Sequence, residues 1–582
     1  MPSYPDQLNP DLLDKIPLDA RVVLDIGCGT GALGAEYKRR NPAARVLGIE
    51  RDPEAARIAA TRLDQVAVVD ADDVPLPFGP VMIDCLIYGD VLEHLRDPWA
   101  VLAQQAKLLS PTGTVLICMP NMDHWSFADR LLRGSWDYEA QGLLDRTHLR
   151  WFNFETTRNA ITAAGLSPHD VHPRIFDSAR AEEFTQAMRP ALEALGIDPA
   201  SYLNRARPLQ YVWRARRQSL AQITVISTML APIGGVSQVR VVDPMRAIAS
   251  DPTVTSVLAQ DFEARGIDPA IPKIFIFHRP LLAGEAGLEP IRRLLALDYV
   301  VVCEFDDHPD YIPVLQRPDI QNFRAVHAIQ TTTEPLAQVL RRDNPEVEVF
   351  PNGIARLPDV RNFTDPSRIT LFFGGLNREL DWPPYVDALN AVAAMAGERL
   401  HFQIVNDRGL FDALVTPHKT FTPLCDYDTY QGILAQCDVS FMPLLDTPFN
   451  RCKSDLKFLE ASAHRVTALA SPIVYGAVIE DGRNGLIFSN ASELQQRLAR
   501  LIADPEAGRA MADAARAHVI KHRMLAYQTA RRVAWYRSLW ARRAELNAAL
   551  LARVPELAVP ASGSGLYLSA GGDAQPADNM AV

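Results

Sequence analysis

The stretch VVLDIGCGTGALG, residues 22–34, decides the fold of this chain. An apolar, β-branched run leads straight into a turn that contains Gly27, Gly29 and Gly31. Glycine lets the backbone turn sharply and approach a ligand closely. Glu50 ends the next expected strand, where a carboxylate accepts hydrogen bonds from two ribose hydroxyls. The pattern therefore predicts a nucleotide-handling α/β unit near the start of the chain.

Two further acidic residues accompany the glycine turn. Asp25 precedes it within the first strand, and Asp70 closes the third expected strand at the level where an adenine amino group lies. The segment GTGALG, residues 29–34, also satisfies the dinucleotide pattern G-x-G-x-x-G. Taken alone, the glycine turn leaves a nicotinamide cofactor open as an alternative.

Length and composition bound the class of protein. The 582 residues are too many for one ordinary core and indicate three or four Rossmann-sized units. A net charge of −11 argues against nucleic-acid binding, which needs a basic stripe to neutralise phosphates. Seven scattered cysteines without a C-x-x-C pair fit a reducing compartment. No cysteine–histidine cluster has zinc spacing, so we expect no metal.

The chain has no pattern of a secreted or membrane-spanning protein. Its N-terminus lacks the basic and apolar regions of a signal peptide. No apolar run approaches the roughly 18 residues that a membrane span needs. We therefore expect a cytoplasmic protein whose only membrane contact is a transient one at the inner surface.

Short β-branched runs alternate with longer helical patterns along nearly the whole chain. This alternation is typical of parallel sheets flanked by helices, so the predicted fold class is α/β. The first block of expected strands comprises 22–26, 45–49, 65–69, 82–88 and 114–119, with an antiparallel pair near 171–176 and 209–214. The second block comprises 223–227, 273–277, 299–305, 328–331 and 347–350, and the third 369–373, 400–405, 419–421, 439–442, 466–470 and 485–488.

Polar segments separate the three blocks of strands. RARRQSLAQ, residues 214–222, ends the first block, and PDVRNFTDPSR, residues 358–368, follows the second. We expect a Rossmann-like domain followed by two consecutive Rossmann-like halves with a cleft between them. The expected domains are 1–218, 222–357 and 366–545, the last with closing helices, and a disordered tail of small residues at 555–582.

The first block resembles class I S-adenosylmethionine-dependent methyltransferases. DIGCGTG, GIERD and IYGDVLEHLRDP carry the resemblance, and LLDRTHLRWFNFETTRNAITAAGL extends it, so that it covers about residues 15–217. The resemblance implies S-adenosylmethionine as the methyl donor. It places the three glycines against the methionine part, Glu50 at the ribose, Asp70 and Ala71 at the adenine, and Gly89, Asp90 and residues 92–94 near the transferred methyl.

Two histidines are candidates for a catalytic base in this domain. Methyl transfer is an in-line displacement that needs a positioned nucleophile and in some cases a general base. His94 and His148 are the candidates. The alternatives stay open: His94 can pack and bond locally at a helix start, and His148 can brace a substrate lid through pairing of Asp145 with Arg146.

A second nucleotide-handling signature lies about 420 residues downstream, in FNRCKSDLKFLEASAHRVTALASP, residues 449–472. Lys453 and Lys457 lie four apart, so the spacing predicts that they share one helical face, with Glu460 three positions further on the same side. Lysines suit the leaving diphosphate of a sugar nucleotide, and the glutamate suits its ribose. The alternative is a solvated helix face with ion pairs along the helix.

Two glycine-containing loops support a nucleotide site in the later blocks. PIGGVSQVR, residues 232–240, contains Gly234 and Gly235, whose amides can approach an anion at a helix N-terminus. FFGGLNRELDW, residues 372–382, repeats the arrangement with Gly374, and Arg378 can bind a diphosphate through its planar fork.

These residues resemble the two-lobed (GT-B) glycosyltransferases, particularly the retaining group called family 4 or group 1. VFPNGI at 349–354 and SPIVYGAVIEDGRNGLIF agree with the resemblance, which spans about 222–540. It implies a nucleotide-sugar donor and no bound metal. The family usually has two glutamates eight positions apart, and here Cys452 stands in place of the first. The lysine that commonly follows the loop arginine is missing too.

Three other polar features have two interpretations each. The acids of CEFDDHPDY, residues 303–311, suggest either a metal site or, as we prefer, strand-end capping and acceptor contacts. His278 ends an expected strand, where it is a catalytic candidate or ties down the loop. Trp382 is either a packing residue or a platform for a sugar ring.

The two signatures together predict a bifunctional enzyme. We expect methyl transfer to a sugar hydroxyl or glycoconjugate and glycosyl transfer from a nucleotide-sugar in surface glycan biosynthesis. Its partners are then small-molecule donors and a glycan or glycolipid acceptor, with no nucleic acid. The alternative is a methyltransferase joined to a degenerate, glycan-binding GT-B module that has lost catalysis.

Overall fold

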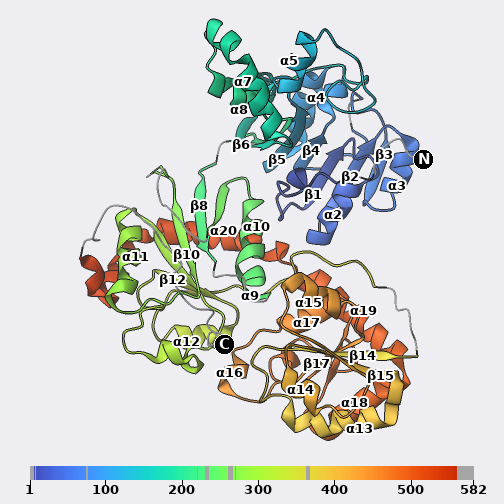
Figure 1. Cartoon of the computed structure of the whole chain (residues 1–582), viewed down its shortest axis with the longest axis vertical. Helices are drawn as coiled ribbons and strands as arrows, with labels where there is room; N and C mark the ends of the chain where they lie inside the picture. Colours follow the sequence, from blue (N-terminus) through green and yellow to red (C-terminus); the bar gives the residue numbers. More distant parts are fainter. Residues whose placement is uncertain are drawn as a thin grey trace. The chain divides into compact units, whose positions relative to one another are not determined.

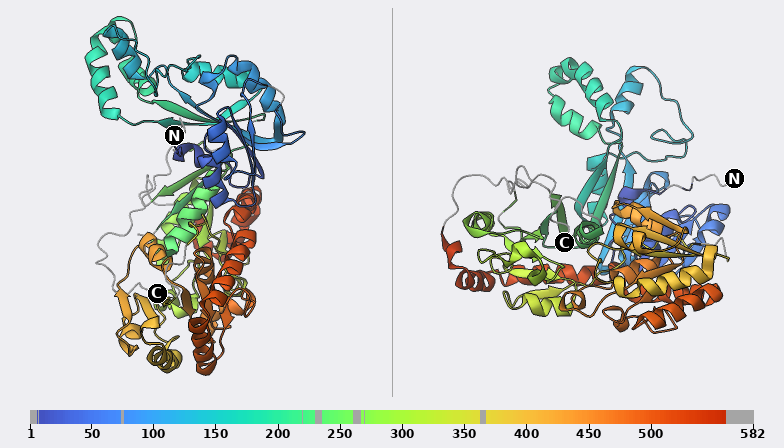
Figure 2. Two further views of the ribbon diagram at one scale, coloured as in Figure 1. Left: turned by 90° about the vertical axis from the view of Figure 1, so that its right-hand side faces the viewer. Right: turned by 60° about the horizontal axis from the view of Figure 1, so that its bottom comes forward.

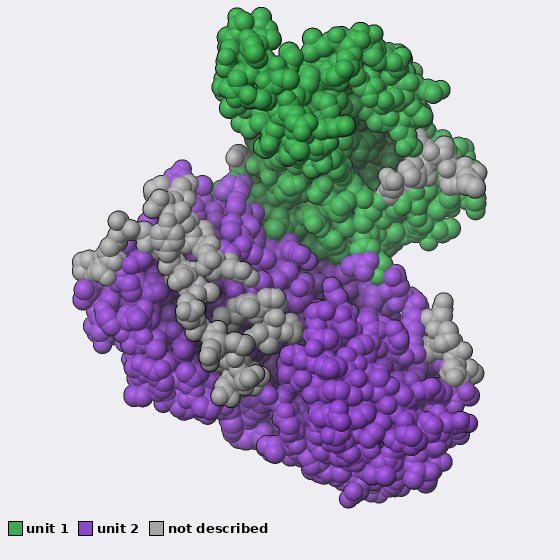
Figure 3. Space-filling model, viewed as in Figure 1, with its two compact units in different colours: residues 1–221, 249–253 green, residues 222–248, 254–582 purple. Residues whose placement is uncertain are grey.

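The computed structural model describes residues 6, 8–73, 76–218, 220–229, 235–259, 267–268, 270–361 and 367–559. The chain divides into two compact units, which Figure 3 distinguishes by colour. Unit 1 comprises residues 1–221 and 249–253, and unit 2 comprises 222–248 and 254–582. Unit 1 contains one sheet and unit 2 contains two (Figure 1). The predicted α/β class with three Rossmann-like sheets is confirmed.

The sheet of unit 1 has the strand order β3-β2-β1-β4-β5-β7-β6. Its strands are β1 (Val22–Ile26), β2 (Arg45–Glu50), β3 (Gln65–Val68), β4 (Ile83–Gly89), β5 (Leu109–Pro120), β6 (Ser167–Arg174) and β7 (Gln210–Arg216). β7 runs antiparallel to both β5 and β6, as the sequence predicts, and the other neighbours are parallel. The order reverses between β1 and β4, and ligands of open α/β sheets bind beyond the carboxyl ends of the strands at such a point.

The helices of unit 1 begin where short polar side chains cap them. The side chain of Asp52 accepts hydrogen bonds from the amides of Glu54 and Ala55, and a proline follows it in the first turn. Asp97 caps the next long helix in the same way. The helices are α1 (Pro10–Leu13), α2 (Ala32–Arg40), α3 (Pro53–Ala59), α4 (Pro98–Gln105), α5 (Trp125–Leu132), α6 (Phe154–Ala163), α7 (Ser178–Ala194) and α8 (Pro199–Ala206), with 3-10 turns η1 (Leu92–His94) and η2 (Ala106–Leu108).

The second sheet, the first of unit 2, is parallel throughout and has the order β13-β12-β11-β10-β8-β9. Its strands are β8 (Ile223–Thr228), β9 (Val254–Ala259), β10 (Lys273–His278), β11 (Val300–Glu304), β12 (Ala328–Thr331) and β13 (Val347–Val349). The sequence did not predict β9. This strand lies at the sheet edge and is only partly buried, so it lacks the continuous apolar run of its neighbours.

The third sheet is also parallel, with the order β16-β15-β14-β17-β18-β19. Its strands are β14 (Ile369–Gly374), β15 (Leu400–Val405), β16 (Lys419–Thr422), β17 (Val439–Met442), β18 (Thr467–Ala470) and β19 (Leu486–Ile487). The strand order reverses between β14 and β17. This reversal places the loop after β14 at the position where a nucleotide binds in sheets of this order.

The helices of unit 2 cover both sheets. With the second sheet lie α9 (Gly235–Ser237), the π-helical turn η3 (Gln238–Val242), α10 (Asp243–Ala249), α11 (Gly284–Ala296), α12 (Glu334–Leu340) and the 3-10 turns η4 (Pro309–Tyr311) and η5 (Pro313–Gln316). With the third lie α13 (Val386–Ala396), α14 (Arg408–Ala413), α15 (Tyr427–Leu434), α16 (Pro448–Arg451), α17 (Leu456–Ala463), α18 (Ala491–Ala503), α19 (Pro505–His522), η6 (Pro383–Tyr385), η7 (Gly397–Arg399) and η8 (Tyr475–Ala477).

The end of the described chain returns from the third sheet to the second. α20 (Ala526–Ala541) buries Tyr536 and Leu539 in the core that β8 and β10 share. α21 (Arg543–Arg553) and η9 (Pro555–Ala558) add Leu550 and Leu557 to the core on the other face. The red helices accordingly follow the green segments in Figure 2.

The tail predicted at 555–582 begins too early, because Leu557 is only 5% exposed. Residues 560–582 lie outside the described residues. Among the residues that the structure describes, no helix is both long and apolar enough to span a membrane.

Candidate functional site

The glycine turn joins β1 to α2 at the carboxyl end of the sheet of unit 1. Gly27, Gly29 and Gly31 have φ angles of 70°, 55° and 77°, a region that L side chains rarely adopt. A Cβ on Gly27 would lie 2.6 Å from Cγ2 of Val91, whereas a Cβ on Gly29 would meet no atom within 4 Å. Gly27 therefore permits close packing within the chain, and the backbone at Gly29 lies open to a ligand.

Glu50, the last residue of β2, holds the glycine turn in place. Its side chain is almost completely buried, and Oε2 accepts a hydrogen bond from the amide of Gly29 at 2.8 Å. Oε1 accepts from the amide of Asp52 at 2.9 Å. Each carboxylate oxygen has a second lone pair, so Glu50 can still accept a hydrogen bond from a ribose hydroxyl.

Asp25 lies buried beneath the turn. Burial, and next the charge of Glu50, disfavour its ionised form and raise the pKa of Asp25 to about 7. Its side chain therefore carries a proton through most of the acidic range.

Asp70 and Ala71 follow β3, which pairs with β2 in the sheet, so they lie at the same edge as Glu50. Asp70 accepts a hydrogen bond from the amide of Asp72 at 3.0 Å. The carbonyl of Ala71 accepts one from Gln105 Nε2 at 3.4 Å. These bonds fix the backbone of the segment to which the sequence assigns the adenine.

Asp90 follows β4 directly, with a positive φ of 57°. Its Oδ1 accepts a hydrogen bond from Gln210 Nε2 at 2.5 Å, and burial raises the pKa of its carboxyl group. β4 pairs with β1, so Asp90 and the glycine turn lie at the same end of adjacent strands. The structure thus gathers the predicted cofactor residues at the reversal point of the sheet of unit 1.

His94 and His148, predicted separately as bases, lie against each other with ring centroids 4.8 Å apart. Glu93 joins them: one possible metal-ligand atom from each of the three residues lies within 4.8 Å of the others. Asp145 accepts hydrogen bonds from the amide and the hydroxyl of Thr147, and these bonds stand where one interpretation placed a pair with Arg146. Sequence reasoning missed Glu93, whose only signal is its position next to His94.

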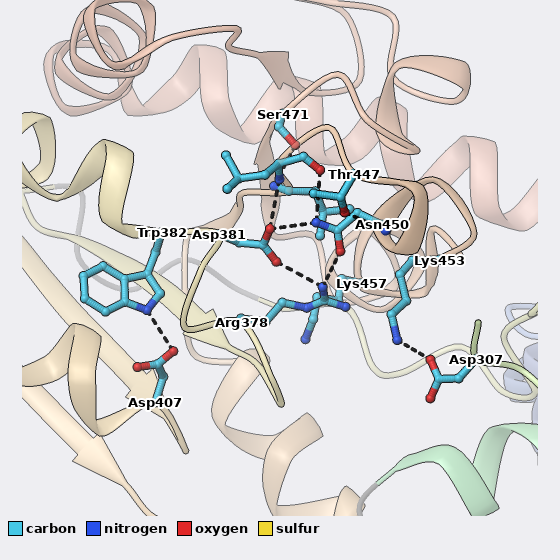
Figure 4. Close-up of polar contacts among 12 residues, drawn as sticks. Asp307, Arg378, Asp381, Trp382, Asp407, Thr447, Asn450, Lys453, Lys457 and Ser471 are labelled. Atoms are coloured by element: carbon cyan, nitrogen blue, oxygen red, sulfur yellow. Dashed lines mark hydrogen bonds and ion pairs between the residues drawn. The ribbon is translucent and has the colours of Figure 1, made fainter. Parts of the chain in front are cut away.

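Unit 2 places Arg378 in a network of side chains beyond the end of β14 (Figure 4). One terminal nitrogen of Arg378 donates to Oδ2 of Asp381 at 3.1 Å and to Oδ1 of Asn450 at 2.9 Å. The Asn450 amide donates in turn to Oδ1 of Asp381 at 2.7 Å, as does the amide of Leu445 at 2.9 Å. The guanidinium is therefore held in one position near Gly374.

Lys457 and Glu460 lie on α17, three positions apart as predicted. Lys457 Nζ donates a hydrogen bond to the carbonyl of Gly374, and burial lowers the pKa of Lys457 to about 8. Glu460 accepts hydrogen bonds from Tyr427 OH at 2.8 Å and Gln431 Nε2 at 3.0 Å, and burial raises its pKa. The alternative of a solvated helix face does not fit two side chains so deeply enclosed.

Lys453 does not share a helical face with Lys457, so that prediction is wrong. α16 ends at Arg451 and α17 begins at Leu456, and Lys453 lies in the non-helical segment between them. Contacts from elsewhere hold this segment: Asn352 Nδ2 donates to Ser454 Oγ at 2.8 Å, Arg523 forms an ion pair with Asp455, and Lys453 forms an ion pair with Asp307 (Figure 4). Burial lowers the pKa of Lys453.

The other predicted glycine loop also approaches α17. A Cβ on Gly235 would lie 2.6 Å from Cδ2 of Tyr427, whose hydroxyl bonds Glu460. Gly235 therefore allows the start of α9 to contact α15 of the third sheet. Gly234 lies outside the described residues.

His278 ends β10 and is only 3% exposed. Neither ring nitrogen has a hydrogen-bond partner among the described residues, so the ring does not tie down its loop by hydrogen bonds. Burial lowers the pKa of His278 to about 4, so the ring is neutral at pH 7. Arg279 beside it donates to Asp306 and Asp307, each at 2.7 Å. These acids serve ion pairing, which favours capping over a metal site.

Cys452 and Trp382 are both packed. Cys452 is 5% exposed and belongs to the apolar cluster that contains Leu550 and Val554. Trp382 packs against the core of the third sheet, and its Nε1 donates to Asp407 Oδ2 at 3.0 Å (Figure 4). Cys452 therefore presents no polar group to the Lys457 network, and the indole of Trp382 is held as a packing residue.

Comparison with curated proteins places the first unit in a family. A methyltransferase domain family matches residues 3–171. Trans-aconitate 2-methyltransferase of Methylobacterium radiotolerans is 34% identical over 202 residues, which are 32% of this chain and 75% of that protein. Ubiquinone biosynthesis O-methyltransferase of Rhodopseudomonas palustris is 32% identical over 161 residues, 26% of this chain and 57% of the relative. The chain spans about half the length of other curated relatives, such as 51% of trans-aconitate 2-methyltransferase of Azoarcus.

Solved structures include a likeness that covers more of the chain. HepE of Anabaena, solved with UDP and glucose, covers 55% of this chain and is itself covered completely, with 13% identity and a TM-score of 0.38. TarM of Staphylococcus aureus covers 46% of this chain over 54% of its own length, with 11% identity and a TM-score of 0.33. On the strength of the matched domain and the Methylobacterium relative, the chain belongs through its first unit to the methyltransferase domain family.

Proposed function

We propose that this chain is a bifunctional transferase. Unit 1 transfers a methyl group from S-adenosylmethionine, and unit 2, a GT-B module, transfers a sugar from a nucleotide-sugar donor. The acceptor is a glycan or glycolipid at the cytoplasmic face of the membrane, and the methyl group goes to a sugar hydroxyl. Two such modules in one chain expose each product to the next site at a raised effective concentration.

The open backbone at Gly29, held by Glu50, carries the proposal for methyl transfer. The Glu50 carboxylate fixes the turn and keeps lone pairs for a ribose, while Asp70 and Ala71 lie at the neighbouring strand end. Membership of the methyltransferase domain family supports the same donor. The printed name of the Rhodopseudomonas relative, an O-methyltransferase, supports an oxygen as the acceptor atom.

The cations beyond β14 carry the proposal for glycosyl transfer. Arg378 and Lys457 both lie at the carbonyl end of this strand, at the reversal point of the third sheet. Positive groups at this position stabilise the diphosphate that departs from a sugar nucleotide. Glu460, buried on the same helix as Lys457, is placed for the ribose of the donor.

Calorimetric titration of the full chain with S-adenosylmethionine, NAD and UDP tests both halves of the proposal. We expect S-adenosylmethionine and UDP to bind and NAD not to bind. Incubation with labelled S-adenosylmethionine and a glycolipid extract should then label the extract. Binding of NAD in place of S-adenosylmethionine would contradict the first half, and failure of every nucleoside diphosphate to bind would contradict the second.

The burial of Cys452 favours a second candidate for unit 2. Where the resembling glycosyltransferases have a glutamate, this chain has a thiol in an apolar cluster, so the module is a candidate for glycan binding without catalysis. Nucleotide-sugar consumption separates the two candidates. Release of UDP from UDP-sugars in the presence of glycolipid supports catalysis, whereas glycan binding without UDP affinity supports the binding module.

A further inference from the structure

We propose that Glu93, His94 and His148 form a binding site for a divalent ion of the first transition series. Glu93 and His94 lie on η1, directly after β4, and His148 lies in the segment between α5 and α6. One possible ligand atom from each of these side chains lies within 4.8 Å of the others. A cation that enters between them needs only small side-chain movements to reach all three.

The carboxylate of Glu93 requires a partner that the rest of the chain does not provide. The side chain is 2% exposed, and both of its oxygens are buried without a hydrogen bond from any other described residue. Buried carboxylates are normally paired with a cation, bound to a metal or held neutral. Asp90 and Asp145 add negative potential at the same place, which favours a cation further.

The two histidines are oriented as metal ligands are. Nδ1 of His94 lies 3.2 Å from the carbonyl oxygen of Thr147, and Nδ1 of His148 lies 3.2 Å from the carbonyl oxygen of Leu143. A carbonyl only accepts, so both Nδ1 atoms carry the proton, and each Nε2 keeps a free lone pair. Ligating histidines characteristically donate their other nitrogen to a carbonyl or carboxylate in this way.

The surrounding backbone holds the three ligands together. The amides of Leu149 and Arg150 both donate to the carbonyl of Glu93, at 2.8 and 3.0 Å. This pair of bonds joins the His148 segment to η1. The hydroxyl of Thr147, which bonds Asp145 at 2.7 Å, lies 3.0 Å from Nδ1 of His94 and extends the support to a second layer.

The donor set selects the class of ion. Two imidazoles and one carboxylate suit zinc, manganese, iron or cobalt, whereas magnesium and calcium prefer oxygen ligands alone. Three protein ligands leave coordination positions open for a small molecule. The site is therefore built for an ion that also binds a substrate atom.

The proposed methyl transfer gives this ion a task, and the following step rests on that proposed function. A hydroxyl oxygen of the acceptor binds the ion, which lowers its pKa, and the hydroxyl proton leaves to water. The oxygen then forms a bond to the methyl carbon while the bond from that carbon to sulfur breaks and its electron pair stays on sulfur. The products are a methyl ether and S-adenosylhomocysteine.

Titration of the chelator-treated, untagged full chain with manganese, zinc and magnesium chlorides tests the site directly. We expect one equivalent of manganese or zinc to bind, with magnesium at least about tenfold weaker because it disfavours imidazole. Glu93→Gln and His148→Ala should each lose the site. His172→Ala, which changes an exposed histidine on β6, is the matched control and should bind as the wild type does.

Melting temperatures of the same samples separate loss of the site from loss of the fold. In chelator, Glu93→Gln should melt no lower than the wild type, because the amide removes an unpaired buried carboxyl group. On addition of manganese, only the wild type and His172→Ala should gain stability. If Glu93→Gln does not fold, His148→Ala gives the same comparison.

The proposal is overturned if the wild type binds neither manganese nor zinc, if Glu93→Gln binds them as tightly as the wild type, or if magnesium binds more tightly than both. Titration with S-adenosylmethionine in chelator keeps this result apart from the proposed methyl transfer. A chain that binds S-adenosylmethionine but no ion loses only the metal site. A chain that binds the ion but no S-adenosylmethionine keeps the site and loses the proposed reaction.

Discussion

Gly27 and Gly29 share a left-handed backbone but have different surroundings. Alanine at either position strains the backbone by about 1–2 kcal/mol. At Gly27 the new Cβ also meets Val91 at 2.6 Å, which adds roughly 1–3 kcal/mol of overpacking, whereas at Gly29 it points into open space. We therefore expect Gly27→Ala to lower the free energy of unfolding more than Gly29→Ala does.

Binding of S-adenosylmethionine should respond in the opposite way. Gly29→Ala places a methyl group where the donor approaches, so its affinity should fall at least about tenfold relative to the stability lost. Urea unfolding and calorimetric titration of the two variants measure both effects. Equal loss of affinity in a Gly29→Ala protein and in the wild type with an unrelated exposed substitution would argue against donor contact at Gly29.

Asp25 makes the stability of unit 1 depend on pH. Its pKa is raised to about 7 in the folded chain, so between about pH 4 and pH 7 the unfolded chain releases a proton that the folded chain keeps. The free energy of unfolding therefore falls as the pH rises through this window. Asp25→Asn removes this effect, and its advantage over the wild type should grow by about 3 kcal/mol between pH 5 and pH 8. Urea unfolding at the two pH values measures it, and a constant difference would contradict the raised pKa.

At the scale of single elements, α17 links nucleotide binding to pH. The pKa of Lys457 is lowered to about 8, so the free side chain loses its charge as the pH rises through 8. UDP should therefore bind with uptake of a proton near pH 8, and its affinity should fall by up to about tenfold per pH unit above that value. Calorimetry in buffers of different ionisation enthalpy measures the uptake.

Two variants serve as controls for this dependence. Lys457→Arg keeps the charge at every accessible pH, so most of the proton uptake should disappear. Arg451→Ala removes an exposed cation that pairs with Asp446 at 2.6 Å and should leave UDP affinity unchanged. Proton uptake that persists in Lys457→Arg would assign the titration to another group.

The segment between α16 and α17 decides what Cys452 can do. Its side chain packs with Leu550 and Val554, so Cys452→Glu, which matches the usual glycosyltransferase pattern, would bury a carboxylate among apolar side chains. We expect this variant to be destabilised by several kcal/mol and to gain no activity. Cys452→Ser should cost about 1–3 kcal/mol. Thermal unfolding compares them, and a Cys452→Glu protein as stable as the wild type would contradict the packing.

At the scale of the whole molecule, each candidate nucleotide site is built from residues of one unit. The glycine turn and its partners belong to unit 1, and the Arg378 and Lys457 network belongs to unit 2. We expect Gly29→Ala and Lys457→Ala to act independently, with a coupling energy below about 0.5 kcal/mol in the double variant. Titration of the single and double variants with S-adenosylmethionine and with UDP measures the coupling. A larger value would mean that the two bound states are linked.

Much of the fold could be predicted because local patterns were strong. The strand β1, its glycine turn and Glu50 follow from apolar runs and punctuating glycines within a short window. β9 was missed because an edge strand that is half exposed has no continuous apolar signal. The helical face assigned to Lys453 was wrong because contacts from Asn352 and Arg523, distant in sequence, hold that segment out of a helix.

The sequence by itself determined the α/β class, the order of strands and the residues at the strand ends, because periodicity and glycine placement act over a few positions. Only the tertiary structure decided which of those residues share a site. It brought His148 to Glu93 across more than fifty positions, turned Cys452 into an apolar core and enclosed Lys457 beside Gly374. Burial and long-range contact set the charge and pairing of a side chain, and neither is written in the spacing of its neighbours along the chain.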